Sequence, residues 1–298
     1  MFIEIRAKGK KKKYYLSQSY RVKGKIKKIV QYLGVNLSEE ELQKLRVKAE
    51  QRILKNVREK SILEFELSEE EIKQYRRYEQ QIEILHLQKL NWKRFTESFT
   101  YNTNAIEGST VALSEVKELL EHKEKPQNAD ELEALNVAEA VEFIQKVKEK
   151  LSLDVIKNIH NICFKGTKSF AGKLRSVEVV IKDREGNIIH RGASATEVVS
   201  LLKDLCKWYG KHIKKYPPLL LAALVHNQFE NIHPFQDGNG RVGRLLLNYV
   251  LLKQGYPPIN IYLKDRARYY RCLQKFDSRN DIKSTLKFLI SQYKKQYR

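Results

Sequence analysis

Short runs of apolar residues, each bounded by polar or basic ones, follow one another at the start of the chain. Residues 2–5 form the first run, residues 14–16 the second and residues 25–33 the third. Runs of this length, rich in β-branched and aromatic residues, are typical of strands. Residues 8–13, one glycine among lysines, have the composition of an exposed turn. The pattern predicts a small β-meander over residues 1–35.

After the third run the apolar spacing changes from that of strands to that of helices. Ser38 and Glu41 have the spacing of a helix-capping box, and the apolar residues that follow recur every three or four positions. A second box of the same type begins at Ser68, and helical spacing predominates from there on. We therefore expect a helical linker over residues 36–67 and a mainly α-helical domain over residues 68–298.

One segment of the helical part has the composition of strands instead. The runs Val177–Ile181 and Asn187–Ile189 are rich in β-branched residues. Residues 183–186 between them include an aspartate and a glycine, which favour a tight turn. The pattern predicts a lone β-hairpin in a helical bundle.

Length and composition narrow the class of protein. The 298 residues, 42% of them hydrophobic, are enough for one large core or for two smaller ones. The chain has no run of about 18 apolar residues, and its first residues lack the layout of a secretory signal. The three cysteines are widely spaced and form no paired metal-binding pattern. We expect a cytoplasmic protein without a membrane span.

The charge is large and unevenly distributed. The chain has 57 Lys and Arg against 36 Asp and Glu, a net charge of +21. The first 35 residues contain eleven basic residues and one acid, Glu4, so eleven minus one places ten of the 21 net charges there. Such a segment would attract a polyanion such as RNA, DNA or an acidic protein. A surface that only improves solubility explains the same composition, so nucleic-acid binding is a secondary hypothesis.

The segment from His233 to Arg244 combines several groups that suit phosphate chemistry; it reads HPFQDGNGRVGR. A run of mostly apolar residues follows, so the segment has the pattern of a glycine-containing loop that enters a helix. Gly238 and Gly240 allow tight backbone geometry and the close approach of a ligand. The N–H groups at a helix N-terminus attract anions such as phosphate.

The charged side chains of this segment add metal and proton chemistry. Arg241 and Arg244 are three positions apart on the first turn and can bind phosphate oxygens in one region. Asp237 is an oxygen ligand of the kind that Mg²⁺ takes while it bridges phosphates. His233, at the mouth of the loop, is a candidate general base. Together these groups predict phosphoryl or nucleotidyl transfer.

The same segment resembles the signature of the Fic family, His-Pro-Phe-x-Asp/Glu-Gly-Asn-Gly/Lys-Arg-x-x-Arg, at every defined position. The resemblance extends to residues 226–232 before the motif, to residues 171–175 before the predicted hairpin and to residues 268–270 after the motif, and covers roughly residues 68–295. It implies a helical fold around the motif helix, with ATP and Mg²⁺ as cosubstrates. The implied reaction is transfer of AMP to a hydroxyl group of a target protein or of the chain itself.

The resemblance also implies a role for each polar motif residue. His233 would deprotonate the target hydroxyl, and Asp237 would hold Mg²⁺. Asn239 and Arg241 would contact the α- and β-phosphates, and Arg244 would hold the γ-phosphate.

The remaining motif residues and the hairpin have implied roles as well. Phe235 would anchor the loop in the core, and Gly238 and Gly240 would complete the nucleotide-binding loop. The hairpin would be the family's flap, which docks the target as an added strand. The residues expected to dock the target are Val177, Val179 and Ile181.

A second family motif precedes the hairpin. The stretch Thr-Asn-Ala-Ile-Glu-Gly that begins at Thr103 resembles the inhibitory motif Ser/Thr-x-x-x-Glu-Gly/Asn. Thr103 and Glu107 share one face of a helix, which we expect around residues 92–108, and Gly108 suits its C-terminal end. As in members with an N-terminal inhibitory helix (class II), Glu107 would pair with Arg244 and block productive binding of the γ-phosphate. In related proteins the same glutamate can instead position a water that removes AMP from a modified target.

The residues leave three functions open. The leading prediction is an autoinhibited protein adenylyltransferase. The second is an enzyme that mainly removes AMP or transfers another phosphate-containing group, and the third is a nucleic-acid-associated regulator that senses nucleotide. A zinc site at His226, Glu230 and His233 is a weaker interpretation, because the spacing differs from that of zinc proteases. We interpret His160 and His190 as structural, and a homodimer remains open.

Overall fold

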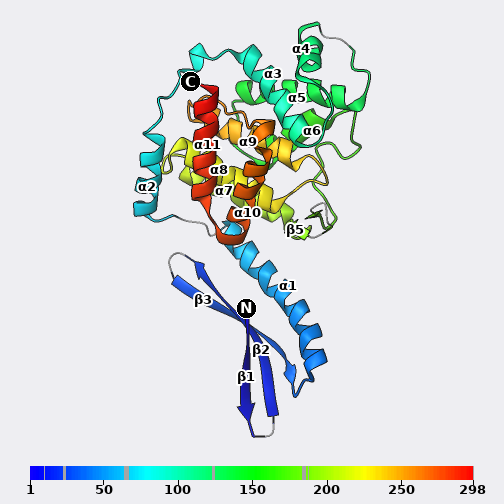
Figure 1. The fold of residues 1–298 in the computed structure, drawn as a ribbon, viewed down its shortest axis with the longest axis vertical. Coiled ribbons are helices and arrows are strands. Elements are labelled where there is room, and N and C mark those ends of the chain that lie inside the picture. The colour runs from blue at the N-terminus through cyan, green and yellow to red at the C-terminus, as the bar shows by residue number, and fades with distance from the viewer. Residues whose placement is uncertain are drawn as a thin grey trace. The chain divides into compact units, whose positions relative to one another are not determined.

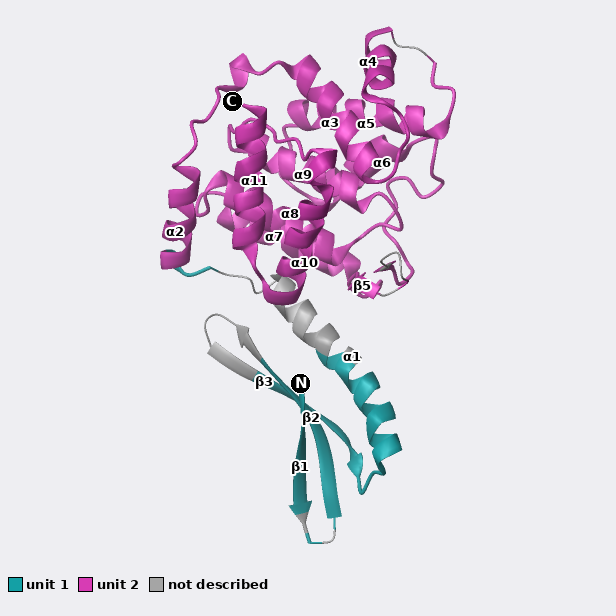
Figure 2. Cartoon of the chain, viewed as in Figure 1, with its two compact units in different colours: residues 1–69 teal, residues 70–298 magenta. Residues whose placement is uncertain are grey.

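The computed structural model describes residues 1–9, 11–22, 25–63, 67–122, 125–182, 186 and 188–297 (Figure 1). Figure 2 shows its two compact units, Met1–Glu69 and Glu70–Arg298. Helices predominate, with two small antiparallel sheets, which confirms the predicted fold class. None of the helices in these described ranges is both long and apolar enough to cross a membrane. Residues of our sequence interpretation that lie outside the described ranges are Lys10, Lys23, Asp183, Arg184, Glu185 and Asn187.

The first unit is a three-stranded antiparallel sheet followed by a helix, and it confirms the predicted meander. Its elements are β1 (Phe2–Lys8), β2 (Lys11–Val22), β3 (Lys25–Val35) and α1 (Glu39–Leu63), with the strands in the order β1-β2-β3. The turn predicted over residues 8–13 is wrong in its second half, because Lys11–Lys13 pair with β1. Because Lys8 pairs with Lys11, the connection between β1 and β2 is short. Gly9 lies in this connection with a φ of +60°.

Alternation along the strands gives this sheet one face that packs on α1. Leu16 of β2 is fully buried between Ala49 and Ile53 of the helix, and Ile3 and Ile29 of the neighbouring strands pack against them. Successive residues of a strand point to opposite sides of the sheet, so the intervening residues face away from α1. The helix that we expected to be a linker therefore belongs to the same compact unit as the sheet.

The second unit is built around two central helices, α8 and α9, which pack against each other (Figure 1). Both are buried along almost their whole length, as expected for helices that are apolar on most sides. The helical elements of this unit are α2 (Glu69–Glu79), η1 (Leu87–Lys89), α3 (Trp92–Ile106), α4 (Leu113–His122), α5 (Ala129–Lys146), α6 (Leu153–Phe164), α7 (Val198–His212), α8 (Pro218–Ile232), α9 (Asn239–Lys253), η2 (Leu263–Asp265), α10 (Arg266–Arg279) and α11 (Ile282–Gln296).

The predicted hairpin is present, but its strands are placed differently from our expectation. Strand β4 (Val180–Lys182) pairs with β5 (Ile188–Arg191), so Ile181 lies in a strand whereas Val177 and Val179 precede it. The prediction of a strand over residues 177–181 is therefore wrong at its start. The reason is that the carbonyl of Val177 accepts a hydrogen bond from the Arg175 side chain (2.8 Å) instead of a strand partner.

Candidate active site

The connection between α8 and α9 carries the first half of the motif. His233 ends α8 in the left-handed conformation, with a φ of 50°, and turns the chain away from the helix axis. Phe235 is fully buried, and its ring stacks on the ring of His160 of α6 with 3.8 Å between the centroids. Gly238 has a φ of +80°, and a Cβ atom there would lie 2.2 Å from the Phe164 ring. Packing from α6 thus fixes the loop and excludes any larger residue than glycine at position 238.

Side-chain hydrogen bonds hold the backbone of the same loop. The Oδ1 atom of Asn239 accepts from the N–H of Phe235, and its Nδ2 atom donates to the Phe235 carbonyl, both at 2.8 Å. His160 accepts from the Gly172 N–H at Nδ1 (2.8 Å), so its Nε2–H donates to the carbonyl of Asp237 (3.1 Å). Asn239 therefore organises the loop in this structure, and its predicted phosphate contact stays a prediction.

Arg175 ties this loop to the base of the hairpin. Its guanidinium is buried and donates to the carbonyls of His233 (2.7 Å), Val177 (2.8 Å), Ile232 (3.2 Å) and Ala193. The acceptors come from the end of α8 and from the segments on both sides of the hairpin. One buried side chain thus sets where the hairpin begins and ends relative to His233.

His233 has the protonation state that a general base needs. Its Nδ1 atom lies 3.3 Å from the carbonyl oxygen of Glu230, an arrangement in which Nδ1 carries the proton and Nε2 accepts one. Burial, and next the nearby His190, lower the pKa of His233 to about 3. His190 of β5 lies 5.7 Å away between ring centroids, and its Nδ1 atom is 3.3 Å from Oδ2 of Asp277 on α10. The His233 imidazole is therefore neutral at physiological pH.

A cavity of about 450 Å³ opens beside His233 at the N-terminus of α9. This volume is in the range of small-molecule sites. The lining of the cavity includes both charged and aromatic side chains, among them Arg244 and Tyr270, which suits a ligand with charged and aromatic groups. Its lining residues include Glu107, Ile181, His233, Asp237, Gly240 and Arg244.

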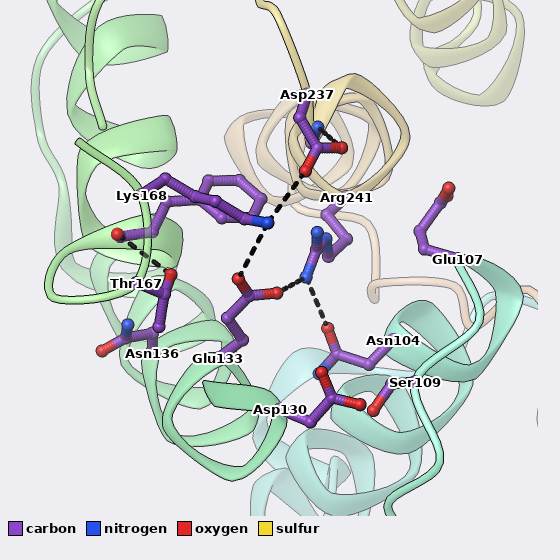
Figure 3. A network of polar contacts seen from close by, with 12 residues as sticks. Asn104, Glu107, Ser109, Asp130, Glu133, Asn136, Thr167, Lys168, Asp237 and Arg241 are labelled. Atoms are coloured by element: carbon purple, nitrogen blue, oxygen red, sulfur yellow. Dashed lines mark hydrogen bonds and ion pairs between the residues drawn. The ribbon is translucent and has the colours of Figure 1, made fainter. Parts of the chain in front are cut away.

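The two arginines of the motif have different partners. Arg241 lies 4.4 Å above the Phe164 ring, forms an ion pair with Glu133 of α5 and donates to Oδ1 of Asn104 of α3 at 3.4 Å (Figure 3). Arg244 lines the cavity, whereas Arg241 is directed toward Glu133 between α5 and α6. The expected contact of Arg241 with the α- and β-phosphates stays a prediction.

Arg244 is held by the residues of the predicted inhibitory motif. Its Nε atom donates to Oγ1 of Thr103 (2.7 Å), and its Nη2 atom donates to the Thr103 carbonyl (2.9 Å) and to Oε1 of Glu107 (2.7 Å). The Arg244 side chain is 2% exposed and that of Glu107 31%. Burial alone would lower the pKa of Arg244, but Glu107 keeps it above its ordinary value. Glu107 caps the C-terminus of α3, and Gly108 follows with a φ of +101°.

The carboxylate of Glu107 also lies against the first turn of α9. A Cβ atom on Gly240 would be 2.2 Å from Oε1 of Glu107. The N-terminal end of a helix attracts anions, so the carboxylate occupies a position that also suits a phosphate group. Glu230 of α8 is buried nearby, and burial raises its pKa to about 8 although Arg244 opposes this shift.

Asp237 presents a carboxylate at the mouth of the cavity. Its side chain is 50% exposed, and Oδ2 lies 3.3 Å from Nζ of Lys168, which also approaches Glu133 at 3.9 Å (Figure 3). Burial raises the pKa of Asp237, but the Gly238 N–H, Arg241 and Lys168 together bring it below its ordinary value. An ionised and accessible carboxylate beside a phosphate site fits Mg²⁺, which usually takes one or two carboxylates together with substrate phosphates.

The zinc interpretation finds no support in the described part of the chain, which contains no cluster of three or more His, Cys, Asp or Glu side chains arranged for a metal. Both ring nitrogens of His226 are within 2.9 Å of other partners, the Gly243 carbonyl and the Tyr269 hydroxyl.

Sequence patterns missed the residues that support the motif from other helices. Glu133, Asn104 and Lys168 lie far from the motif in sequence, and no spacing rule links them to it. The one available signal was Glu133 itself, an acid on a helix whose neighbouring positions, such as Ala134 and Val137, are apolar and buried. A buried acid of this kind indicates a buried cation as its partner.

Comparison with known families matches residues 150–251 to the Fic/DOC family. The chain is 31% identical over 198 residues to protein adenylyltransferase Fic of Nematostella vectensis, which covers 63% of this chain and 45% of that protein. It is 30% identical over 189 residues to protein adenylyltransferase fic-1 of Caenorhabditis elegans, which covers 59% of this chain and 35% of that protein. The chain thus spans less than half the length of these relatives.

Solved structures share the fold. A Fic-domain-containing signaling protein from Bacteroides thetaiotaomicron is 27% identical, with a TM-score of 0.62 over 81% of this chain and 92% of that chain. A Fic family protein from Desulfovibrio desulfuricans is 25% identical, with a TM-score of 0.60 over 76% of this chain and 73% of that chain. The motif, the helical architecture and these similarities agree: residues 150–251 match the Fic/DOC family, and the fold of the chain is similar to that of solved Fic proteins.

Proposed function

We propose that this chain is a protein adenylyltransferase, which transfers AMP from ATP to a hydroxyl side chain, and that Glu107 keeps the activity low. The observation that carries the proposal is the convergence of His233, Asp237, Gly240 and Arg244 on one cavity. Its similarity to proteins named as adenylyltransferases supports the same conclusion.

The geometry supports a direct displacement at the α-phosphorus of ATP. Nε2 of the neutral His233 removes the proton of the target hydroxyl, and the hydroxyl oxygen attacks the α-phosphorus. The bond from that phosphorus to the pyrophosphate oxygen breaks, so an AMP ester and pyrophosphate are formed. The N–H groups of the first turn of α9 and the guanidinium of Arg244 bind the triphosphate. Mg²⁺, held by Asp237 together with the phosphates, would neutralise charge on the leaving pyrophosphate.

The hairpin supplies a place for the target. Ile181 of β4 lines the cavity and is 37% exposed, and among the described residues β4 and β5 pair with no third strand, which leaves room for an added one. Arg175 holds the base of this hairpin and the carbonyl of His233 at the same time. A target strand docked here would therefore present its hydroxyl at a fixed distance from the base. Val177 and Val179, which precede β4, stay part of this proposal only as flanking contacts.

The pair of Glu107 and Arg244 supports the proposed inhibition. While Arg244 donates to Glu107, the same Nη2 atom is not available for a γ-phosphate. The carboxylate beside Gly240 also repels a phosphate at the helix N-terminus. ATP must therefore displace Glu107 before its triphosphate can bind productively.

Removal of AMP is a second candidate, which one observation favours. The carboxylate of Glu107 is 31% exposed and lines the same cavity as His233. A carboxylate so placed can position a water molecule for attack on an AMP ester. In that case the wild-type chain would release AMP from a modified target, and Glu107→Ala would abolish the release.

The proposal is tested by transfer of label from ATP labelled at the α-phosphate, in the presence of Mg²⁺, to lysate protein or to the chain itself. We compare the wild type with Glu107→Ala and with Glu107→Ala/His233→Ala. Glu139→Ala is the matched control, because it removes an acid whose ion pair with Lys165 is exposed and remote from the cavity. We expect Glu107→Ala to increase labelling and the second substitution to abolish it. Labelling that survives the loss of His233 would overturn the proposed mechanism.

A further inference from the structure

The proposed transferase site does not use the sheet of the first unit, although this sheet carries the most unusual composition in the chain. One of its faces packs on α1 through Leu16 and its apolar neighbours. The opposite face combines cationic and aromatic side chains. Strand alternation and register place the cationic and aromatic residues Phe2, Arg6, Lys13, Tyr15, Lys28 and Tyr32 on this face, together with Glu4, Ser17 and Val30.

The strand register brings these residues together. Arg6 pairs with Lys13 across β1 and β2, and Tyr15 pairs with Tyr32 across β2 and β3. The Tyr15 and Tyr32 rings are 5.3 Å apart between centroids. The guanidinium of Arg6 lies 4.5 Å above the Tyr15 ring. The result is a continuous patch in which cations alternate with aromatic rings.

The patch is exposed, and the core of the first unit does not explain it. Phe2 is 50% exposed and Tyr32 51%. A single acid, Glu4, occurs among the first 35 residues, and it already pairs with Arg6 (3.3 Å) and with Lys28. Neighbouring exposed aromatic rings surrounded by polar side chains are typical of a surface that binds a ligand.

We propose that this face binds a single strand of nucleic acid, with unpaired bases stacked on Phe2 and Tyr32 and with phosphates at Arg6, Lys13 and Lys28. The positive charge fits a phosphate backbone. The exposed rings fit bases that are not already paired, because aromatic side chains stack on the faces of unpaired bases. A polyanion without bases would contact only the charged side chains and leave the aromatic rings uncovered. A duplex would do the same, because its bases stay stacked on one another. The inference is independent of the proposed transferase activity.

The test measures binding of the full chain to a fluorescent single-stranded oligonucleotide of mixed sequence, about 15 nucleotides long, enough to cover one such surface. RNA and DNA strands are measured separately, together with the matching duplex and heparin. Phe2→Ala/Tyr32→Ala removes the proposed stacking without a change in charge. Ile5→Ala is the control on the opposite face, where Ile5 is 57% exposed.

A second pair of variants separates this patch from the general charge of the chain. Arg6→Gln/Lys13→Gln/Lys28→Gln removes the proposed phosphate contacts. Its control removes three exposed, ion-paired lysines of the second unit, Lys93, Lys146 and Lys207. Circular dichroism of each variant checks that the sheet is retained.

We expect the stacking variant to bind a single strand at least about 30-fold more weakly, because each of the two lost stacks contributes about 5-fold or more. The charge variant should lower the slope of log affinity against log salt by about 2, for three single-strand phosphate contacts. Ile5→Ala and the second-unit lysine variant should change neither value. The proposal would be overturned if the charge variant and the second-unit lysine variant lost affinity equally. Tighter binding of the duplex than of the single strand, or no effect of the stacking variant, would also overturn it.

Discussion

Replacing Glu107 by alanine is expected to raise the rate of AMP transfer and to lower the stability of the fold at the same time. The two effects have one cause, because the substitution removes the acid that holds Arg244 away from substrate and also leaves Arg244 without its ion-pair partner. Opposite changes in activity and stability are typical of a residue that restrains a functional site.

The magnitude follows from the burial of the pair. Breaking a fully buried ion pair costs about 3–5 kcal/mol, whereas an exposed pair contributes about 0–1 kcal/mol. Arg244 is 2% exposed but Glu107 is 31% exposed, so the pair lies between these limits. Thr103 keeps two of the hydrogen bonds of Arg244. We expect a loss of about 1–3 kcal/mol in the free energy of unfolding. If the same free energy opposes productive ATP binding, the transfer rate rises about 5- to 150-fold.

The assay measures the initial rate of label transfer at an ATP concentration well below its KM, where the rate reports productive ATP binding, and the unfolding of the same preparations in urea. Glu107→Gln should lie between the wild type and Glu107→Ala, because an amide can accept from Arg244 but carries no charge. Glu139→Ala should leave the rate unchanged and alter the stability by less than about 1 kcal/mol. A Glu107→Ala variant that is less stable but transfers no faster would refute the reasoning, since the pair would then be structural and not inhibitory.

Four further outcomes are expected in the Glu107→Ala background. His233→Asn should lower the transfer rate by about 10²–10⁴-fold, as expected for loss of a general base, and the variant's melting temperature checks that it is folded. Because a base with a pKa of about 3 stays neutral, the rate should not fall as the pH is lowered through 6.5, the ordinary pKa of histidine; a pH–rate profile that halves there would contradict the assignment. Gly238→Ala should destabilise the fold by about 2–4 kcal/mol, because the added Cβ meets the Phe164 ring and the backbone is left-handed, and urea unfolding measures this loss. Arg175→Lys should raise the KM for the protein target more than the KM for ATP, because one ammonium cannot hold four carbonyls; equal effects on both would show that Arg175 supports only the fold.

The parts of the site that are continuous in sequence could be predicted, because local chemistry determines them. The glycine-containing loop and the start of α9 follow from residues within a few positions of one another, whereas the burial of Phe235 was implied by the family resemblance and depends on packing from α6. The meander was predictable for the same reason, since strand alternation is a local pattern.

The remaining features depend on contacts between distant segments. The partners of Arg241 come from α5 and α3, and no local rule distinguishes Glu133 from other acids of its helix. The β4 strand begins later than its composition suggests because Arg175 takes the carbonyl of Val177. The pairing of Glu107 with Arg244 followed from family resemblance, and spacing alone gave only a shared helix face for Thr103 and Glu107.

The most direct test of the central claim compares two labelled forms of ATP with the Glu107→Ala variant. The account predicts that label from the α-phosphate becomes attached to protein, that label from the γ-phosphate does not, and that pyrophosphate is released in equal amount. Attachment of the γ-label, or no attachment of the α-label by a variant that is folded and binds ATP, would contradict AMP transfer as the activity of this chain.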